Sequence, residues 1–200
     1  MKYFFILLFT TFSLYATSSD FESVKEQYFK SYDYEQMGKY KESIKVLSPL
    51  YKKYPKAYTL NLRFGWLFYL DKRYNDAEKY YKKASLINSY ALDPRLGLIR
   101  IYLGRGDYAE AEVVAYELLK IDYYNYYANL YVSKALIAQG KYEVAMSIIF
   151  KMLSLYPTDI SYLEQLAVVY KQTDSPYLQK LYEDILILDP NNVYVRGEMK

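Results

Sequence analysis

One short turn recurs along this chain at a fixed distance. The stretch "MGKYKES" from Met37 returns as "DKRYNDA", "RGDYAEA" and "QGKYEVA". Its tyrosine comes back every 34 residues, as Tyr40, Tyr74, Tyr108 and Tyr142. A constant period of this size is typical of stacked structural units, because each unit buries its apolar face only against its neighbours. The chain is therefore expected to be an array of similar units.

Alignment on this period, starting at Val24, shows which places in the repeat are physically constrained. The eleventh place is large and apolar or aromatic: Tyr34, Phe68, Tyr102, Leu136 and Tyr170. The twentieth place is small, which lets two helices approach closely: Ser43, Ala77, Ala111 and Ala145. The fifteenth place is mostly glycine, whose tolerance of positive φ suits a point where a helix stops and the chain reverses.

These columns resemble the tetratricopeptide repeat, which also has a small residue at its eighth place and proline at its thirty-second. The second unit carries most of the pattern, as Gly65, Phe68, Ala77, Tyr81 and Ala84. The resemblance covers residues 24–190 and implies an all-α fold, a right-handed α-solenoid of about five helix-turn-helix units. The expected units begin at Val24, Tyr58, Leu92, Tyr126 and Ile160. The tryptophan usual near the start of the family's first helix is missing from every unit.

The N-terminal residues have the layout of a secretory signal peptide. An apolar stretch from Tyr3 to about Phe12 follows Lys2, and small residues surround Ala16. The stretch is shorter than the roughly 20 residues that a spanning helix needs. We therefore expect cleavage after Ala16, a short lead over residues 17–23, and an exported protein of a bacterial periplasm or cell envelope without an integral span. An uncleaved membrane anchor is the alternative.

The C-terminal residues 191–200 are expected to form a short tail or a partial capping helix. Arrays of this family usually finish with an extra helix that covers the last unit, and ten residues are too few for a full one. The sequence therefore predicts that a face carrying Leu166, Tyr170 and Leu181 is partly exposed. Uncapped repeats tend to associate, so self-association through this end is expected.

Composition narrows the classes of function. The chain has 26 basic and 23 acidic residues with mixed signs, which argues against nucleic acid as the main partner. Cysteine and histidine are both absent, which removes thiol nucleophiles, histidine bases and nearly all zinc or haem ligation. Paired acidic residues have spacings that point apart on a helix. We therefore expect no enzyme activity, no catalytic residues, no cofactor and no metal.

The remaining signal is a face on the first helix of each unit. Its second, fifth, ninth and twelfth places lie together by helical periodicity, and in tetratricopeptide arrays this face lines the concave groove. It is aromatic and aliphatic around a few cations, and exposed apolar surface of this kind usually marks a binding site. The candidate partner-binding residues are Tyr28, Tyr32, Leu62, Trp66, Tyr69, Leu96, Arg100, Leu103, Leu130 and Lys134.

The resemblance favours a protein–protein interaction scaffold that holds a segment of another exported or envelope protein in this groove. An alternative function is a small-molecule or glycan-binding module, in which tyrosines and Trp66 stack on sugar rings or apolar ligands. A structural alternative is that the array closes enough to bury the groove residues, or that the N-terminal segment fills the groove.

Overall fold

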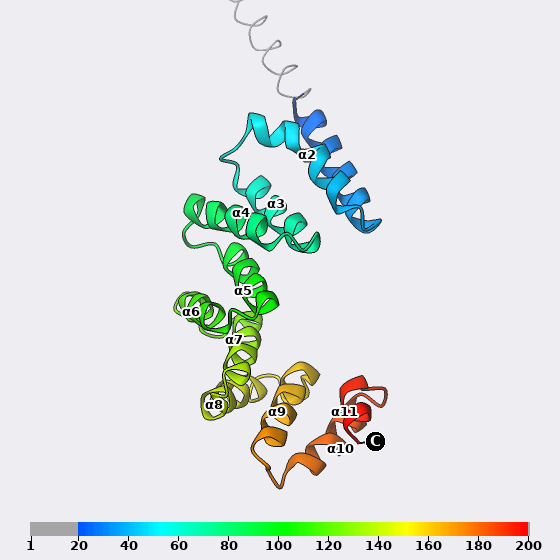
Figure 1. Cartoon of the computed structure of the whole chain (residues 1–200), viewed down its shortest axis with the longest axis vertical. Helices are drawn as coiled ribbons and strands as arrows, with labels where there is room; N and C mark the ends of the chain where they lie inside the picture. The colour runs from blue at the N-terminus through cyan, green and yellow to red at the C-terminus, as the bar shows by residue number, and fades with distance from the viewer. Residues whose placement is uncertain (1–19, 200) are drawn as a thin grey trace, which may run out of the picture. The chain divides into compact units, whose positions relative to one another are not determined.

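The computed structural model describes residues 20–199, so the predicted signal peptide lies outside the described residues. Within this range every regular element is a helix, and short turns connect consecutive helices (Figure 1). The predicted all-α fold of helix pairs is confirmed. The chain divides into two compact parts, Met1–Ser89 and Tyr90–Lys200, and each is described by itself.

The N-terminal part begins with a helix over residues 20–36. The helices that follow are α2 (Tyr40–Lys53), α3 (Tyr58–Leu70) and α4 (Tyr74–Ile87). Helix α3 packs against both α2 and α4. Helices α3 and α4 approach closely at Gly65, because a Cβ added there would lie 2.7 Å from Cδ1 of Tyr81. This contact explains why the eighth place of the repeat favours a small residue.

The C-terminal part contains seven described helices. They are α5 (Asp93–Arg105), α6 (Tyr108–Leu119), α7 (Tyr126–Ala138), α8 (Tyr142–Leu153), α9 (Ile160–Gln172), α10 (Leu178–Leu188) and α11 (Val193–Glu198). Consecutive helices from α5 to α11 pack against each other, and α7 also contacts both α5 and α9. Ala111 and Ala145, at the twentieth place, are fully buried. Small side chains at this column therefore lie inside the packed helix pairs, as the sequence predicts.

The fifteenth place has the same backbone conformation in all five repeats. Among the described residues, positive φ occurs only in this column: Gly38 (70°), Lys72 (58°), Gly106 (83°), Gly140 (73°) and Asp174 (49°). The next residue then donates its backbone N–H to the carbonyl at the eleventh place, for example Lys39 to Tyr34 at 2.8 Å. Such a bond closes a Schellman motif, which satisfies a free carbonyl at the helix end. The recurring turn is thus a helix stop.

The fourth place, where the family usually has tryptophan, carries a polar side chain in the first four repeats. Each of these side chains donates to the backbone carbonyl four residues earlier, at 2.8 to 3.2 Å: Gln27 to Ser23, Asn61 to Ala57, Arg95 to Ala91 and Asn129 to Asn125. In the second and fourth repeats the asparagine also donates to the loop before the helix. In the second to fourth repeats this hydrogen bond lies at the start of the helix, whereas Gln27 and Ser23 both lie within the helix over residues 20–36.

The C-terminal end differs from its predicted form. Leu166 and Leu181 are buried, at 5% and 8% exposure, so the prediction of a partly exposed face is wrong for these two residues. Helix α11 packs against α10, and its Val195 is fully buried. The side chain of Asn192 accepts a hydrogen bond from the backbone N–H of Val195 at 3.0 Å. Helix α11 therefore packs on the last helix pair, although the sequence predicted that this end would stay partly exposed.

Helix α11 is the beginning of a sixth repeat. Asn192 caps it as Asn125 caps α7 and Asp159 caps α9, in each case by accepting from the N–H three residues ahead. The third residue of each of these helices is fully buried: Ala128, Tyr162 and Val195. Helix α11 has six residues in the described range, and Tyr194 is its second residue.

Candidate functional site

Five of the predicted groove residues come together in the N-terminal part. Tyr28 and Tyr32 lie on the helix over residues 20–36, and Leu62, Trp66 and Tyr69 lie on α3. The hydroxyl of Tyr28 donates to Oγ1 of Thr59 at 3.3 Å. The rings of Trp66 and Tyr69 stack with their centroids 5.7 Å apart. The two first helices therefore present one joined aromatic face, as the periodicity predicts.

Arg63 forms the centre of this face, and the sequence reasoning missed it. Its side chain is only 7% exposed and pairs with the carboxylate of Glu35. One guanidinium nitrogen donates to Oγ of Ser31 at 3.1 Å, and the guanidinium lies 3.8 Å from the ring centroid of Tyr32. A buried ion pair of this kind joins two repeats. Arg63 occupies the sixth place of its repeat, and Gln165, at the same place of the fifth repeat, is also a buried polar residue.

Trp66 is also tied into this cluster. Its indole Nε1 donates to Oε1 of Glu35 at 2.6 Å, so the same carboxylate holds both Arg63 and Trp66. The side chain is half-buried. Trp66 is one of the partner-binding residues predicted from the sequence. The structure gives its polar edge a role in joining the first two repeats.

Four predicted groove residues of the C-terminal part do not form a comparable open face. Leu96 and Leu130 are buried, at 8% and 6% exposure, and belong to the core. Leu103 is half-buried. Arg100 donates its Nε–H to the hydroxyl of Tyr131 at 3.1 Å. Helix α7 contacts both α5 and α9, and this packing covers side chains that lie at the edge of the groove face.

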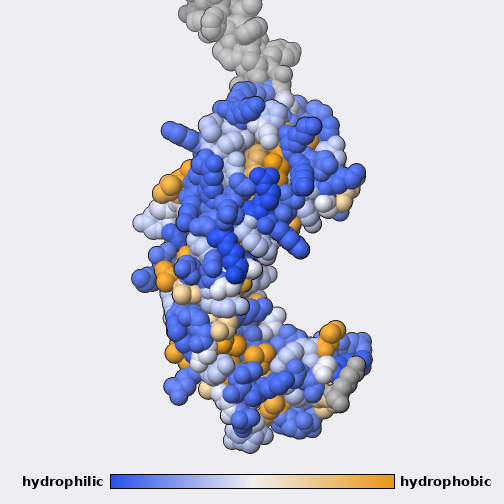
Figure 2. All heavy atoms as spheres, viewed as in Figure 1, coloured by the Kyte–Doolittle hydropathy of each residue, from blue (hydrophilic) through white to orange (hydrophobic). Residues whose placement is uncertain are grey.

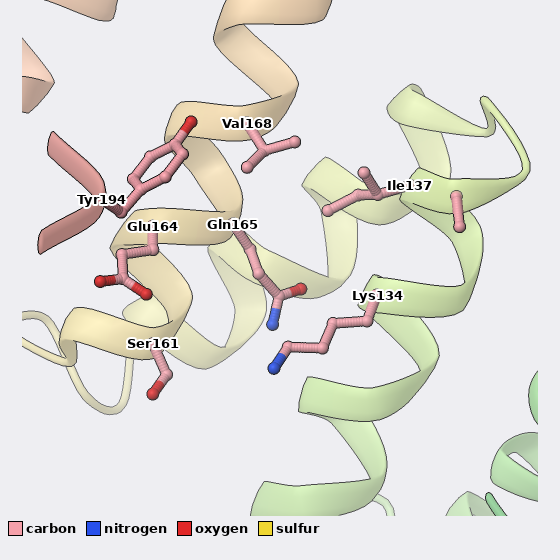
Figure 3. Close-up of a pocket in the computed structure, with 8 residues that line it drawn as sticks. Lys134, Ile137, Ser161, Glu164, Gln165, Val168 and Tyr194 are labelled. Carbon is pink, nitrogen blue, oxygen red and sulfur yellow. The ribbon is translucent and has the colours of Figure 1, made fainter. Parts of the chain in front are cut away.

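Lys134, the last predicted groove residue, lines a pocket of about 330 Å³ (Figure 3). The other residues that matter for its chemistry are Ile137 from α7, Ser161, Glu164, Gln165 and Val168 from α9, and Tyr194 from α11. Most of them occupy groove places of the fourth, fifth and sixth repeats. On the face that Figure 2 shows, apolar residues of each part lie in separate patches within a hydrophilic surface. In the C-terminal part, the predicted groove places contribute to this local pocket.

The pocket has one cation and one carboxylate. The exposed ammonium of Lys134 makes no hydrogen bond or ion pair with any residue between 20 and 199. Oε1 of Glu164 accepts from Nδ2 of Asn192 at 2.7 Å. The buried amide of Gln165 donates to the carbonyl of Leu130 at 3.2 Å and accepts from Ser133. Burial raises the pKa of the Tyr194 phenol, which keeps the hydroxyl protonated.

Tyr194 lines the pocket from a segment that lies beyond the five predicted repeats. The repeat pattern is recognisable in the sequence only up to Pro190, because the last ten residues are too few to display a column pattern. Asn192 followed by Val195 repeats the spacing of Asp159 and Tyr162, and this cap spacing was the signal that could have revealed the sixth repeat.

Residues 20–199 contain no group of three or more histidine, cysteine, aspartate or glutamate side chains arranged to hold a metal ion. In the same range, no helix has both the length and the apolar character that crossing a membrane requires.

The family models that match this chain and a solved structure similar to it are both of tetratricopeptide-repeat proteins. Two models described as tetratricopeptide repeat match residues 30–91 and 68–123. A tetratricopeptide repeat protein from Parabacteroides merdae has a similar structure, with a TM-score of 0.78 at 17% identity over 87% of this chain and 70% of that chain. No curated protein matches this sequence.

Two further solved structures share the fold. The first is PilW, described as a widely conserved type IV pilus biogenesis factor, with a TM-score of 0.71 at 15% identity over 82% of this chain and 76% of that chain. The second is MamA, with a TM-score of 0.72 at 14% identity over 86% of this chain and 95% of that chain. At these identities the likeness concerns the fold alone.

Proposed function

Because the chain belongs to the tetratricopeptide-repeat family, we propose that it is a non-enzymatic scaffold of the cell envelope that binds a segment of another exported protein. Arrays of this kind in general use their groove faces as protein-binding surfaces. The partner-binding residues of this proposal are those that line or border the pocket, with Lys134 first among them. The aromatic face around Trp66 is a second contact region on the N-terminal part.

The pocket between α7, α9 and α11 carries this proposal. It combines apolar walls with a small number of polar groups, which is the usual composition of a specific binding site. Lys134 supplies an ammonium without a partner among the described residues, and such a group at a groove can orient an incoming chain. The side chains of Gln165 and Glu164 are already held by hydrogen bonds, so the polar groups are preorganised.

The envelope location rests on different observations. The sequence begins with a basic residue, an apolar stretch and small residues, in the order that signal peptides have. A protein with the same fold is described as a type IV pilus biogenesis factor, which makes an envelope role reasonable to test here. Fractionation of cells that produce the full chain is the direct measurement, and recovery in the cytoplasmic fraction alone contradicts the proposed location.

Site-specific photocrosslinking tests the proposed binding. A benzoylphenylalanine placed at Ile137 lies in the pocket, whereas the same group at Val144 lies on an exposed position of α8. We expect one discrete exported protein to be captured from position 137 and not from position 144. Lys134→Glu should reduce that capture. Equal capture at both positions, or none at position 137, contradicts the proposal.

Exposed tyrosines favour a glycan as the second candidate ligand. Tyr123 and Tyr124 are 58% and 55% exposed and have ring centroids 4.9 Å apart, and Tyr127 stacks on Tyr131 at 6.0 Å. Exposed rings of this kind can stack on sugar faces. Retention of the full chain on a glycan matrix, lost in Tyr127→Ala, supports this candidate against the scaffold.

A further inference from the structure

The pocket has a third wall, which the five predicted repeats do not supply. Tyr194 of α11 lines it together with residues of α7 and α9 (Figure 3). Helix α11 is fixed by Asn192, which donates to Glu164, and by the ion pair between Lys171 and Glu198. Val195 adds a fully buried anchor. These contacts place the Tyr194 ring at the pocket in the absence of a ligand.

The charges around the pocket disfavour a charged occupant. Lys134 projects from α7, and Glu164 belongs to α9 (Figure 3). A charged side chain between them would be attracted by one group and repelled by the other. The remaining walls are Ile137, Val168 and the ring of Tyr194, which suit an apolar or aromatic group. The occupant that fits is therefore large and uncharged.

The size and polar groups of the pocket favour a peptide. Its volume of about 330 Å³ lies at the lower end of the range of ligand pockets, about 300 to 1,000 Å³, so it holds one anchoring group. A peptide has a carbonyl and an N–H on either side of each side chain. Lys134 can donate to such a carbonyl, and the second oxygen of Glu164 can accept from such an N–H. An extended segment matches both.

We propose that the pocket takes one large, uncharged side chain of an extended partner segment, and that Tyr194 determines which side chain fits. This inference rests on the proposed function, because both require a peptide in the groove. It adds a specificity-determining residue on α11, beyond the five predicted repeats. The ring of Tyr194, rather than its hydroxyl, forms the wall.

Selection from a phage-displayed library of random peptides on the full chain tests this inference. We expect the selected peptides to share one large apolar or aromatic residue. Tyr194→Ala should weaken the best of these peptides by on the order of tenfold, and selection on that variant should favour a larger anchor. Tyr194→Phe keeps the ring and should bind within about threefold of the original. Tyr177→Ala is the matched control, because Tyr177 is 67% exposed and away from the pocket lining.

The outcomes separate this inference from the proposed function. If Ile137→Asp abolishes peptide binding but Tyr194→Ala changes neither affinity nor anchor preference, α11 is only a cap and the inference is wrong. If no peptide is selected, or if the library yields nothing while a glycan binds, both fail. Circular dichroism checks that each variant is folded. Tyr194→Leu replaces the alanine variant if that variant melts, because leucine keeps apolar cover against the neighbouring helices.

Discussion

Lys72 has a backbone conformation that its side chain disfavours. Its φ of 58° places it in the left-handed region between α3 and α4, where three other repeats use glycine. The side chain is exposed and forms no hydrogen bond or ion pair with residues 20–199. Lys72→Gly therefore removes no side-chain hydrogen bond or ion pair within this range. The substitution changes chiefly the conformational energy of the backbone.

The expected magnitude follows from two opposing effects. A residue with a Cβ in the left-handed helical conformation costs about 1–2 kcal/mol. Glycine makes the unfolded chain more flexible, which lowers stability by about 0.4–1 kcal/mol. We therefore expect Lys72→Gly to raise the free energy of unfolding by roughly 1 kcal/mol. Gly38→Ala should lower it by a similar amount, because no atom lies within 4 Å of the added Cβ and only the backbone is affected.

Chemical denaturation followed by circular dichroism measures both effects. Lys79→Gly is the matched control, because Lys79 is exposed within α4 and glycine in a helix interior costs about 1 kcal/mol. The three variants lie in the same N-terminal part, so their effects on its stability can be compared. A loss of stability in Lys72→Gly equal to that in Lys79→Gly would refute the assignment of strain to this turn.

Three other perturbations test the packing. Arg63→Ala removes the ion-pair partner of Glu35 in a mostly buried site and should cost roughly 3 kcal/mol by denaturation, with partial recovery when Glu35→Gln is added. Gly65→Ala drives a Cβ to 2.7 Å from the Tyr81 ring and should cost about 1–3 kcal/mol, and an unchanged melting curve would contradict the close contact. Burial raises the pKa of the Tyr162 phenol above its usual value of about 10. The contribution of this neutral phenol to stability is therefore present below about pH 10 and is lost as the pH rises above that value. Melting followed against pH should show a smaller loss in Tyr162→Phe.

The repeat period was enough to predict the fold and the turns. The helix stop involves the eleventh place, the fifteenth place and the residue after it, all within one repeat. The sequence of a single repeat is therefore enough to predict it. Gly38 and Gly106 confirm it, and Lys72 and Asp174 adopt the same conformation without glycine. The small residues at the eighth and twentieth places work in the same local way. The conformation and packing of these places, whose contacts lie within one repeat, could therefore be predicted from the sequence.

The candidate site was harder to predict, because burial depends on neighbouring helices. Periodicity placed Leu96 and Leu130 on the groove face, but contacts of α7 with α5 and α9 bury them. Arg63 could be understood only with its partner Glu35, which lies 28 residues earlier and on another helix. Tyr194 belongs to a repeat too short to recognise by period. Each of these residues depends on a contact between repeats.

Helix α11 is too short to exist by itself. Isolated helices of fewer than about 12 residues are marginal in water, and α11 has six. Its order comes from Asn192, the Lys171–Glu198 pair and buried Val195. It should therefore form late during folding and open first in the native state, with rapid exchange of its amide hydrogens. A segment bound against Tyr194 would slow that exchange, so amide protection at the chain's end reports whether the pocket is occupied.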